Sequence, residues 1–450
     1  MKMTNRVLLV AVSAIALSSC ATFKGKKKTP VLGNRIAILQ GENGVVADKT
    51  ISGVQVLVPP AETNDSWAQP GGSPSKSMGQ LALGNALNRA WSVTIDGGSN
   101  RQRLGAAPVI GGGKLFVIDV NATVHAYSAS TGASAWEASI ATTDKKARSA
   151  RFGGGVSFDE GKVFATDGLG DVVALDAASG KEVWRAKPGA PLRGAPSVAN
   201  GQIYVLSQDN QLYVMSQTDG TVVWTASGSI ETQGVFGVAA PAVSQGTVVA
   251  GFSSGELNAY RYENGRTLWQ DALSRSSIST SVSSLADIDA DPVIDRGIVF
   301  AVGQGGRMVA LEIVSGQRLW EQNFAGISTP WIAGEWVFLV TDDARLVCLA
   351  RATGKVRWIS QLRHFESEKI QKDGTIKDKK KANAITWYGP VLAGGRLVLT
   401  NSLGEIVSAS VEDGKLGTVI ESKAPFTLPP VVANSTLYVL DQKGRLAAYK

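Results

Sequence analysis

The chain of 450 residues repeats one short phrase about every 40 to 50 residues, and this repeat limits what it can fold into. The phrase is complete in Ala174–Trp184, where a short apolar run leads through a Ser-Gly pair to a Trp four residues further on. Gly supplies the positive φ that a tight turn requires, and the Asp, Asn, Ser or Thr before it favours the turn. The phrase therefore predicts a strand, a tight turn and a second strand that carries the Trp. The glycines of the six complete copies are Gly132, Gly180, Gly220, Gly265, Gly316 and Gly354.

Strand repeats of this length are typical of the blades of a β-propeller. A Trp on each outer strand can fill the space between one sheet and the next, which buries a large apolar surface. We predict this docking role for seven residues, with Thr418 at the eighth equivalent position: Trp91, Trp136, Trp184, Trp224, Trp269, Trp320 and Trp358.

The two ends of the repeat region complement each other. The chain ends with two strand-like segments that lack a Trp strand, whereas residues 90–95 form a Trp strand that lacks its blade. Joining them closes the ring and removes the open sheet edges. We therefore predict an all-β fold over residues 86–450, an eight-bladed β-propeller whose N-terminal strand completes the last blade; seven blades is the alternative.

The first 19 residues have the pattern of a signal peptide. Lys2 and Arg6 precede an apolar run that is too short to span a bilayer as a mature helix. The run ends in Leu-Ser-Ser-Cys20, which resembles a bacterial lipobox, and Cys20 is then the lipid-modified first residue of the mature protein. An ordinary signal peptide that ends near a Cys is the alternative.

The residues that follow are expected to tether the propeller. Several acyl chains on Cys20 suffice for stable membrane anchoring, and by resemblance to bacterial lipoproteins Ala21 favours the outer membrane. Residues 20–85 show no strong helical period and contain loop-like and basic runs. We interpret them as a flexible stalk and lead-in.

Composition argues against several kinds of function. The net charge of +7 is spread evenly, so no nucleic-acid binding is predicted. The chain contains two His residues and, besides Cys20, only Cys348, which makes a zinc site or a Cys/His nucleophile hard to assemble. We predict no catalytic residues, no metal site and no cofactor.

Repeats with a docking Trp resemble those of the quinoprotein dehydrogenases, which depend on pyrroloquinoline quinone (PQQ) and have eight blades. Enzymes of that family hold the quinone beneath two adjacent Cys residues, and this chain has no such pair. A PQQ-dependent enzyme remains an alternative, as does a periplasmic polysaccharide-binding propeller. Four Trp residues outside the docking positions bear on the second alternative: Trp67, Trp331, Trp336 and Trp387.

The lipobox, the stalk, the eight PQQ-like repeats and the missing cofactor residues together resemble the BamB family. Members of that family are lipoprotein subunits of the Bam complex, which folds β-barrel proteins into the bacterial outer membrane. The resemblance implies a non-catalytic scaffold that is lipid-anchored at the periplasmic face of the outer membrane. Its implied partners are BamA, the other Bam subunits and unfolded outer-membrane β-barrel proteins.

The same resemblance implies where the partner binds. In the family, an Asp-x-Asp sequence before a blade's Pro lies in a loop implicated in contacting BamA, and here it corresponds to Asp287 and Asp289. Two carboxylates on a protruding loop can pair with basic residues of a partner; a turn stabilised by the two Asp side chains is the alternative. A second contact loop of the family corresponds to residues 233–237, where Val235 is apolar and Phe236 replaces an Arg.

The chain departs from the family in an insertion at residues 363–384, which is strongly charged. Such a loop is expected to be solvated. A docking arm specific to this lineage is the alternative.

Overall fold

The structure is a computed structural model that describes residues 45–99, 102–141, 154–230, 239–273, 287–367, 369–370, 376–377 and 383–450. The signal peptide, Cys20, Val235 and Phe236 lie outside these residues. Every regular element of the described residues is a β-strand, and none of them forms a helix with the length and apolarity of a membrane span.

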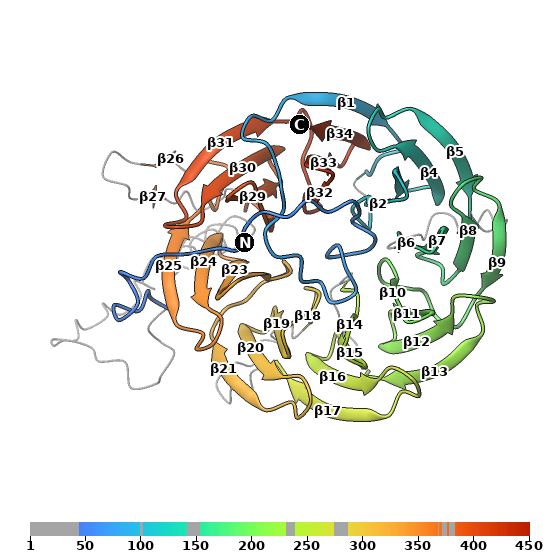
Figure 1. Cartoon of the computed structure of the whole chain (residues 1–450), viewed down its shortest axis with the longest axis horizontal. Coiled ribbons are helices and arrows are strands. Elements are labelled where there is room, and N and C mark those ends of the chain that lie inside the picture. Colours follow the sequence, from blue (N-terminus) through green and yellow to red (C-terminus); the bar gives the residue numbers. More distant parts are fainter. Residues whose placement is uncertain are drawn as a thin grey trace, which may run out of the picture. The chain divides into compact units, whose positions relative to one another are not determined.

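Eight four-stranded antiparallel sheets surround a central axis, as Figure 1 shows. The predicted eight-bladed propeller is confirmed. Blade 1 is β2 (Val109–Gly111), β3 (Lys114–Ile118), β4 (Thr123–Ser128) and β5 (Ser134–Ser139); blade 2 is β6 (Gly154–Asp159), β7 (Lys162–Asp167), β8 (Val172–Asp176) and β9 (Glu182–Ala186); blade 3 is β10 (Ser197–Ala199), β11 (Gln202–Leu206), β12 (Gln211–Ser216) and β13 (Val222–Ser227); blade 4 is β14 (Ala242–Ser244), β15 (Thr247–Gly251), β16 (Glu256–Arg261) and β17 (Thr267–Ala272).

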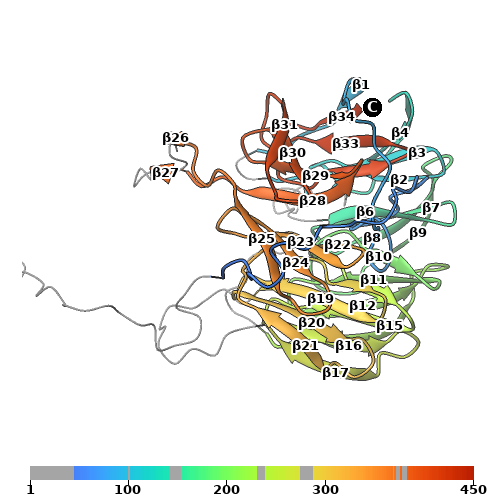
Figure 2. The ribbon, with the colours of Figure 1, turned by 60° about the vertical axis from the view of Figure 1, so that its left-hand side comes forward.

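The second half of the ring repeats this order from the axis outward. Blade 5 is β18 (Val293–Asp295), β19 (Ile298–Gly303), β20 (Arg307–Glu312) and β21 (Arg318–Gln322); blade 6 is β22 (Trp331–Ala333), β23 (Trp336–Val340), β24 (Arg345–Ala350) and β25 (Val356–Gln361); blade 7 is β28 (Trp387–Ala393), β29 (Arg396–Asn401), β30 (Glu405–Ser410) and β31 (Leu416–Glu421); blade 8 is β32 (Val431–Ala433), β33 (Thr436–Leu440), β34 (Arg445–Tyr449) and β1 (Arg89–Thr94). Within the charged insertion, β26 (Lys369–Ile370) pairs with β27 (Ile376–Lys377), and Figure 2 shows this pair beside the blades.

The ring closes as predicted, because the first strand completes the last blade. β1 pairs antiparallel with β34, with Trp91 opposite Ala448. Beyond the strands, Asn88 and Lys450 exchange two backbone hydrogen bonds of 2.7 and 2.9 Å. The two ends of the ring thus satisfy each other's backbone groups.

The position of each strand in its blade follows from its residues. The inner strands are continuous apolar runs such as that of β11, because neighbouring blades cover both of their faces. The outermost strands alternate instead: in β13, Trp224 is buried and its neighbours on either side are exposed. The core therefore lies between the blades, and the outer strand of each blade faces water.

The seven predicted docking tryptophans lie between blades and share one geometry. Each indole packs on the turn Gly of the next blade; a Cβ on Gly180, for example, would come within 2.6 Å of Trp136. Each Nε1 also donates to a backbone carbonyl next to that turn, as Trp136 does to Ala177 at 3.1 Å. The other six acceptors are Ala129, Gln217, Tyr262, Ile313, Arg351 and Val411.

Residues 62–82, here called the hub segment, run across the centre of the ring (Figure 1). The segment hydrogen-bonds the innermost strand of all eight blades. Its partners from blade 1 to blade 8 are Ile110, Phe158, Val198, Val243, Ile294, Trp331, Leu392 and Val432. These bonds pair backbone groups at strand edges that would otherwise lie unsatisfied near the axis.

The interpretation of residues 20–85 as a flexible stalk is therefore wrong for residues 45–85, which belong to one compact unit with the propeller. Val56, Trp67, Leu81 and Leu83 are buried in its core. The hub segment has no sequence period because its partners come from eight different blades at irregular intervals. Residues 20–44 lie outside the described part of the chain.

Candidate partner-binding site

The predicted contact residues Asp287 and Asp289 lie in the segment that leads into β18. We call residues 287–291 the acidic stretch. Both carboxylates face Arg193, which leads into β10 of blade 3: Arg193 Nη2 lies 2.9 Å from Asp287 Oδ1 and 3.8 Å from Asp289 Oδ1. Gln304 completes the cluster by donating from Nε2 to Asp289 Oδ2 at 2.7 Å and from its backbone N–H to the Asp287 carbonyl at 2.9 Å.

The expectation that these two carboxylates protrude is wrong. The side chains of Asp287 and Asp289 are 1% and 8% exposed, and that of Arg193 is 3% exposed. They are buried because the lead-in segments of blades 3 and 5 converge near the axis, and Arg193 supplies from within the chain the cation that we expected from a partner. Nor do the described contacts form the alternative Asp-stabilised turn, since the carboxylates accept hydrogen bonds from the side chains of Arg193 and Gln304.

Arg193 is a site residue that the sequence analysis missed. Its signal was a charged residue two positions before the Ala-Pro that opens a blade. No local pattern connects it to Asp287, which follows 94 residues later. Only the closed ring brings the two together.

One guanidinium between two buried carboxylates leaves the cluster with excess negative charge. Burial, with the nearby charges of Asp287 and Asp342, raises the pKa of Asp289 to about 7, and Arg193 acts in the opposite direction. Asp289 therefore keeps a proton up to near neutral pH, because a second charged carboxylate is disfavoured in one buried site.

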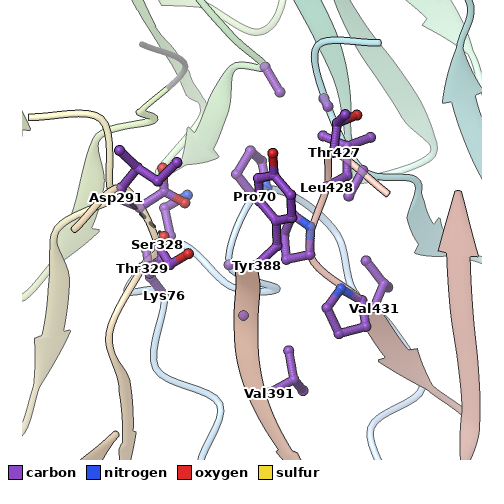
Figure 3. A pocket seen from close by; sticks show the side chains of 18 of the residues that line it. Pro70, Lys76, Asp291, Ser328, Thr329, Tyr388, Val391, Thr427, Leu428 and Val431 are labelled. Atoms are coloured by element: carbon purple, nitrogen blue, oxygen red, sulfur yellow. Dashed lines mark hydrogen bonds between the residues drawn. The ribbon is translucent and has the colours of Figure 1, made fainter. Parts of the chain in front are cut away.

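A cavity of about 330 Å³ lies beside this cluster at the hub. Asp289, Asp291 and Gln304 line one part of it, and the hub segment contributes Trp67 and Lys76. Figure 3 shows Lys76 and Asp291 together on one wall, with Tyr388 and Leu428 elsewhere in the lining. The lining is mostly apolar, so the few charged groups in it lie in a poorly hydrated environment.

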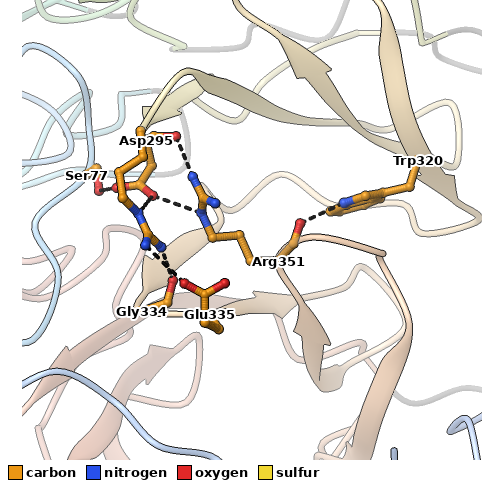
Figure 4. Close-up of polar contacts among 7 residues, drawn as sticks. Ser77, Asp295, Trp320, Gly334, Glu335 and Arg351 are labelled. Atoms are coloured by element: carbon orange, nitrogen blue, oxygen red, sulfur yellow. Dashed lines mark hydrogen bonds and ion pairs between the residues drawn. The ribbon is translucent and has the colours of Figure 1, made fainter. Parts of the chain in front are cut away.

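A second polar network joins the hub segment to blades 5 and 6 (Figure 4). Ser77 donates to Asp295 at 2.9 Å, and Arg351 donates to the other carboxylate oxygen of Asp295 at 3.0 Å. The carbonyl of Arg351 accepts the hydrogen bond of the docking residue Trp320. Arg296 pairs with Glu335 at 3.0 Å at the exposed edge of the network. The hub segment is thus connected through side chains to the contact between two blades.

The four tryptophans outside the docking positions are all buried. Trp67 and Trp331 stack with their ring centroids 6.1 Å apart, and Trp336 and Trp387 lie in the same core cluster. A sugar ring stacks on exposed aromatic faces, and these rings are already covered. The geometry therefore gives no support to the polysaccharide-binding alternative.

Cys348 and His125, which were considered for catalysis, lie in packed surroundings within the blades. Cys348 is buried in β24, and burial raises the pKa of its thiol. His125 lies 2.9 Å from Asp119 and 3.2 Å from Glu137, and these carboxylates raise its pKa against the effect of burial. Among the described residues, no three His, Cys, Asp or Glu side chains are grouped so that they could hold a metal ion.

Known proteins resemble the chain in sequence over most of this ring. The family model described as "Outer membrane protein assembly factor BamB" matches residues 86–147 and 122–360, more than half of the chain. The protein of that name from Yersinia pestis is 25% identical over 255 residues, which cover 56% of this chain and 60% of the relative. The one from Escherichia coli K12 is 27% identical over 303 residues, which cover 58% of this chain and 72% of the relative.

Solved structures share the fold. The crystal structure of BamB from Moraxella catarrhalis superposes with a TM-score of 0.66 at 16% identity, over 81% of this chain and 100% of that one. A europium-containing methanol dehydrogenase superposes with a TM-score of 0.65 at 13% identity, over 83% of this chain and 89% of that one. The propeller alone therefore does not distinguish an assembly factor from a dehydrogenase.

Proposed function

The chain belongs to the family of the outer membrane protein assembly factor BamB, and on that premise we propose that it is a non-catalytic scaffold of the Bam complex. In this role it binds BamA and other Bam subunits and assists the folding and insertion of β-barrel proteins into the outer membrane. The family match over residues 86–360 is the observation that carries the proposal. Cys20 holds the protein by its lipid at the periplasmic face of that membrane.

The described geometry supports a scaffold. The hub segment crosses the axis and is bonded to every blade, which gives a stiff ring with little freedom between its parts. Binding to such a preformed surface costs little conformational entropy. A stiff ring is what a subunit needs if it is to hold its partners at fixed positions.

We propose that the BamA contact involves the acidic stretch and residues 233–237, which include Val235 and Phe236. Because Asp287 and Asp289 are buried against Arg193, their part in this contact is to hold the shape of the surface. Val235 and Phe236 then provide the apolar anchor, since a few side chains that become fully desolvated in well-packed pockets carry most of the energy at protein interfaces.

Unfolded β-barrel segments are proposed to bind at the outer strands of the blades. These strands lie at the edges of their sheets, and several of them expose apolar side chains: Val183, Val222, Val223, Leu268, Leu319, Leu416 and Val419. An extended peptide adds readily to such an edge through backbone hydrogen bonds. The alternation of apolar and polar residues along a barrel strand suits an edge of this kind.

The proposal is tested by affinity purification of the lipidated protein from outer membranes and identification of the proteins that accompany it. We expect BamA in the wild-type sample and a strong loss of BamA with Phe236→Asp. The matched control is Val314→Asp, at a residue 75% exposed in the outer turn of blade 5, which is expected to retain BamA. Absence of BamA from the wild-type sample would exclude the proposed role.

A further inference from the structure

The hub segment carries a buried lysine in an unusual backbone conformation. Lys76 is 2% exposed and has a φ of 65°, in the left-handed region that side chains other than Gly rarely adopt. Its aliphatic stem passes over Gly71, where a Cβ would come within 2.8 Å of Lys76 Cδ. Two local features of the segment therefore direct this side chain inward to the hub cavity.

The ammonium group of Lys76 binds blade 3 and is connected through it to the segment ahead of blade 4. Its Nζ donates to Ser197 Oγ of blade 3 at 2.9 Å, and that hydroxyl donates to the Pro241 carbonyl ahead of blade 4 at 2.6 Å. Across the same wall of the cavity lies Asp291, which leads into blade 5 (Figure 3). Burial lowers the pKa of Lys76 to about 8, and the nearby Asp291 carboxylate acts in the opposite direction.

Asp291 in turn organises the backbone around it. Its carboxylate accepts a hydrogen bond from the Ala240 N–H at 2.7 Å, and its own N–H donates to Thr329 Oγ1 at 3.2 Å. Burial raises the pKa of Asp291, while Lys76 and the hydrogen bonds with Ala240 and Thr329 act in the opposite direction. Lys76 is thus the cation that favours the charged form of this carboxylate.

The acidic stretch thus has a cation from elsewhere in the chain near each of its ends. Arg193 binds Asp287 at its start, and Lys76 faces Asp291 at its end. Only three residues lie between Asp287 and Asp291, so the backbone between them has few alternative paths. Loss of either cation should release one end of the stretch.

We propose that Lys76 is a positioning residue that fixes the buried acidic stretch and so supports the surface that the partner recognises. The hub segment then has a second role besides closing the axis, because it sets the geometry of a contact surface built by blades 3 to 5. This inference rests on the proposed function for the partner and on the geometry above for the positioning itself.

The test uses the mature full-length protein and the variants Lys76→Met and Lys76→Met/Asp291→Asn. Met keeps the length and apolar stem of Lys, and Asn keeps an oxygen for the Ala240 N–H while removing the charge that required Lys76. We expect Lys76→Met to accelerate hydrogen exchange of the Ala240 and Gln304 amides at least tenfold and to weaken binding of the periplasmic domains of BamA at least tenfold. The double variant is expected to restore both values to within threefold of the wild type.

The neighbouring Ser77→Ala is the matched control. It removes one hydrogen bond of the hub segment, to Asp295, without touching the acidic stretch, so exchange at Ala240 and binding should stay within twofold of the wild type. If Lys76 only stabilised the fold, Lys76→Met would lower the thermal stability. The double variant would then not regain binding.

Unchanged exchange in Lys76→Met, or a double variant that rescues neither exchange nor binding, would overturn the inference. If Lys76→Met does not fold, the double variant decides: native exchange in it supports the pairing, and failure to fold contradicts it. If the wild type does not bind BamA, the proposed function fails, whereas the exchange measurements still test the positioning.

Discussion

At the scale of single residues, the cluster of Arg193, Asp287 and Asp289 shows how a buried site controls its own charge. A single guanidinium cannot neutralise two carboxylates, and the apolar surroundings disfavour an uncompensated charge. The proton retained near neutral pH on Asp289 solves this conflict. Stability should therefore depend on pH through this residue.

The first prediction concerns Asp289→Asn. The folded protein raises the pKa of Asp289 from 3.8 to about 7, so the stability that comes from its bound proton is present at low pH and is lost as pH rises through about 7. Asn needs no proton. The free energy of unfolding of the variant, relative to that of the wild type, should therefore increase by about 1–3 kcal/mol between pH 5 and pH 8. Urea unfolding at the two pH values measures it, and a difference that does not change with pH would contradict the assigned burial.

The second prediction concerns Arg193→Met, which leaves the two buried carboxylates without their cation. Removal of one partner from a buried ion pair costs about 3–5 kcal/mol of unfolding free energy. The matched control is Arg261→Met, which breaks an ion pair with Glu263 in which both side chains are more than half exposed; it should cost less than about 1 kcal/mol. Equal losses of unfolding free energy in the two variants would contradict the burial of the Arg193 site, because they would mean that water screens its charges as it does at the surface.

At the scale of the element, the turn and the docking Trp act as one device that joins each blade to the next. The exception at Thr418 has a physical reason. The Trp of each outer strand packs on the turn between the third and fourth strands of the next blade, and blade 8 has no such turn, because its third strand ends the chain and its fourth strand is β1. A Trp in β31 would therefore have no turn Gly to pack on.

The third prediction compares two glycines that differ only in what surrounds them. Gly180 and Gly201 have φ values of 73° and 72°, but a Cβ would meet Trp136 only at Gly180, with open space at Gly201. Gly201→Ala should therefore cost only the left-handed conformation, about 1–2 kcal/mol. Gly180→Ala should cost about 1–3 kcal/mol more because it overpacks the docking indole. Thermal unfolding of the two variants shows which is less stable. If Gly180→Ala is no less stable than Gly201→Ala, the indole of Trp136 does not pack on Gly180.

The blades, the hub segment and the acidic stretch differ in how far the sequence could predict them. The blades were predictable because the turn glycines and docking tryptophans recur at near-constant spacing, and the resemblance to the BamB family that followed from them is confirmed by the family match. The hub segment was not predictable, since its hydrogen bonds go to eight separate strands and most of them use backbone groups, which leave no sequence pattern. The pairing of Arg193 with Asp287 depends on the closure of the ring, so the acidic stretch was identified while its burial was not.

At the scale of the whole molecule, the ring is closed twice. β1 closes the circumference by pairing with β34, and the hub segment closes the axis by bonding to all eight blades. Both come from the N-terminal side of the propeller. Opening of any blade should therefore disturb the whole ring, and unfolding should be cooperative.

The fourth prediction follows from this arrangement. A chain shortened to residues 86–450 keeps every blade strand but loses the hub segment and four buried apolar side chains, Val56, Trp67, Leu81 and Leu83. At about 1.5–3 kcal/mol for each buried side chain, it should be less stable than residues 45–450 by several kcal/mol. Urea unfolding of the two chains by circular dichroism measures the difference, and equal midpoints would show that the hub segment is dispensable.

We propose that this closed ring binds a partner and does not turn over a substrate. The most direct measurement is a titration of the mature protein against the purified periplasmic domains of BamA. We predict saturable one-to-one binding that Phe236→Asp weakens at least tenfold and that Val314→Asp leaves unchanged. Binding that does not saturate, or that both variants weaken equally, would contradict the account.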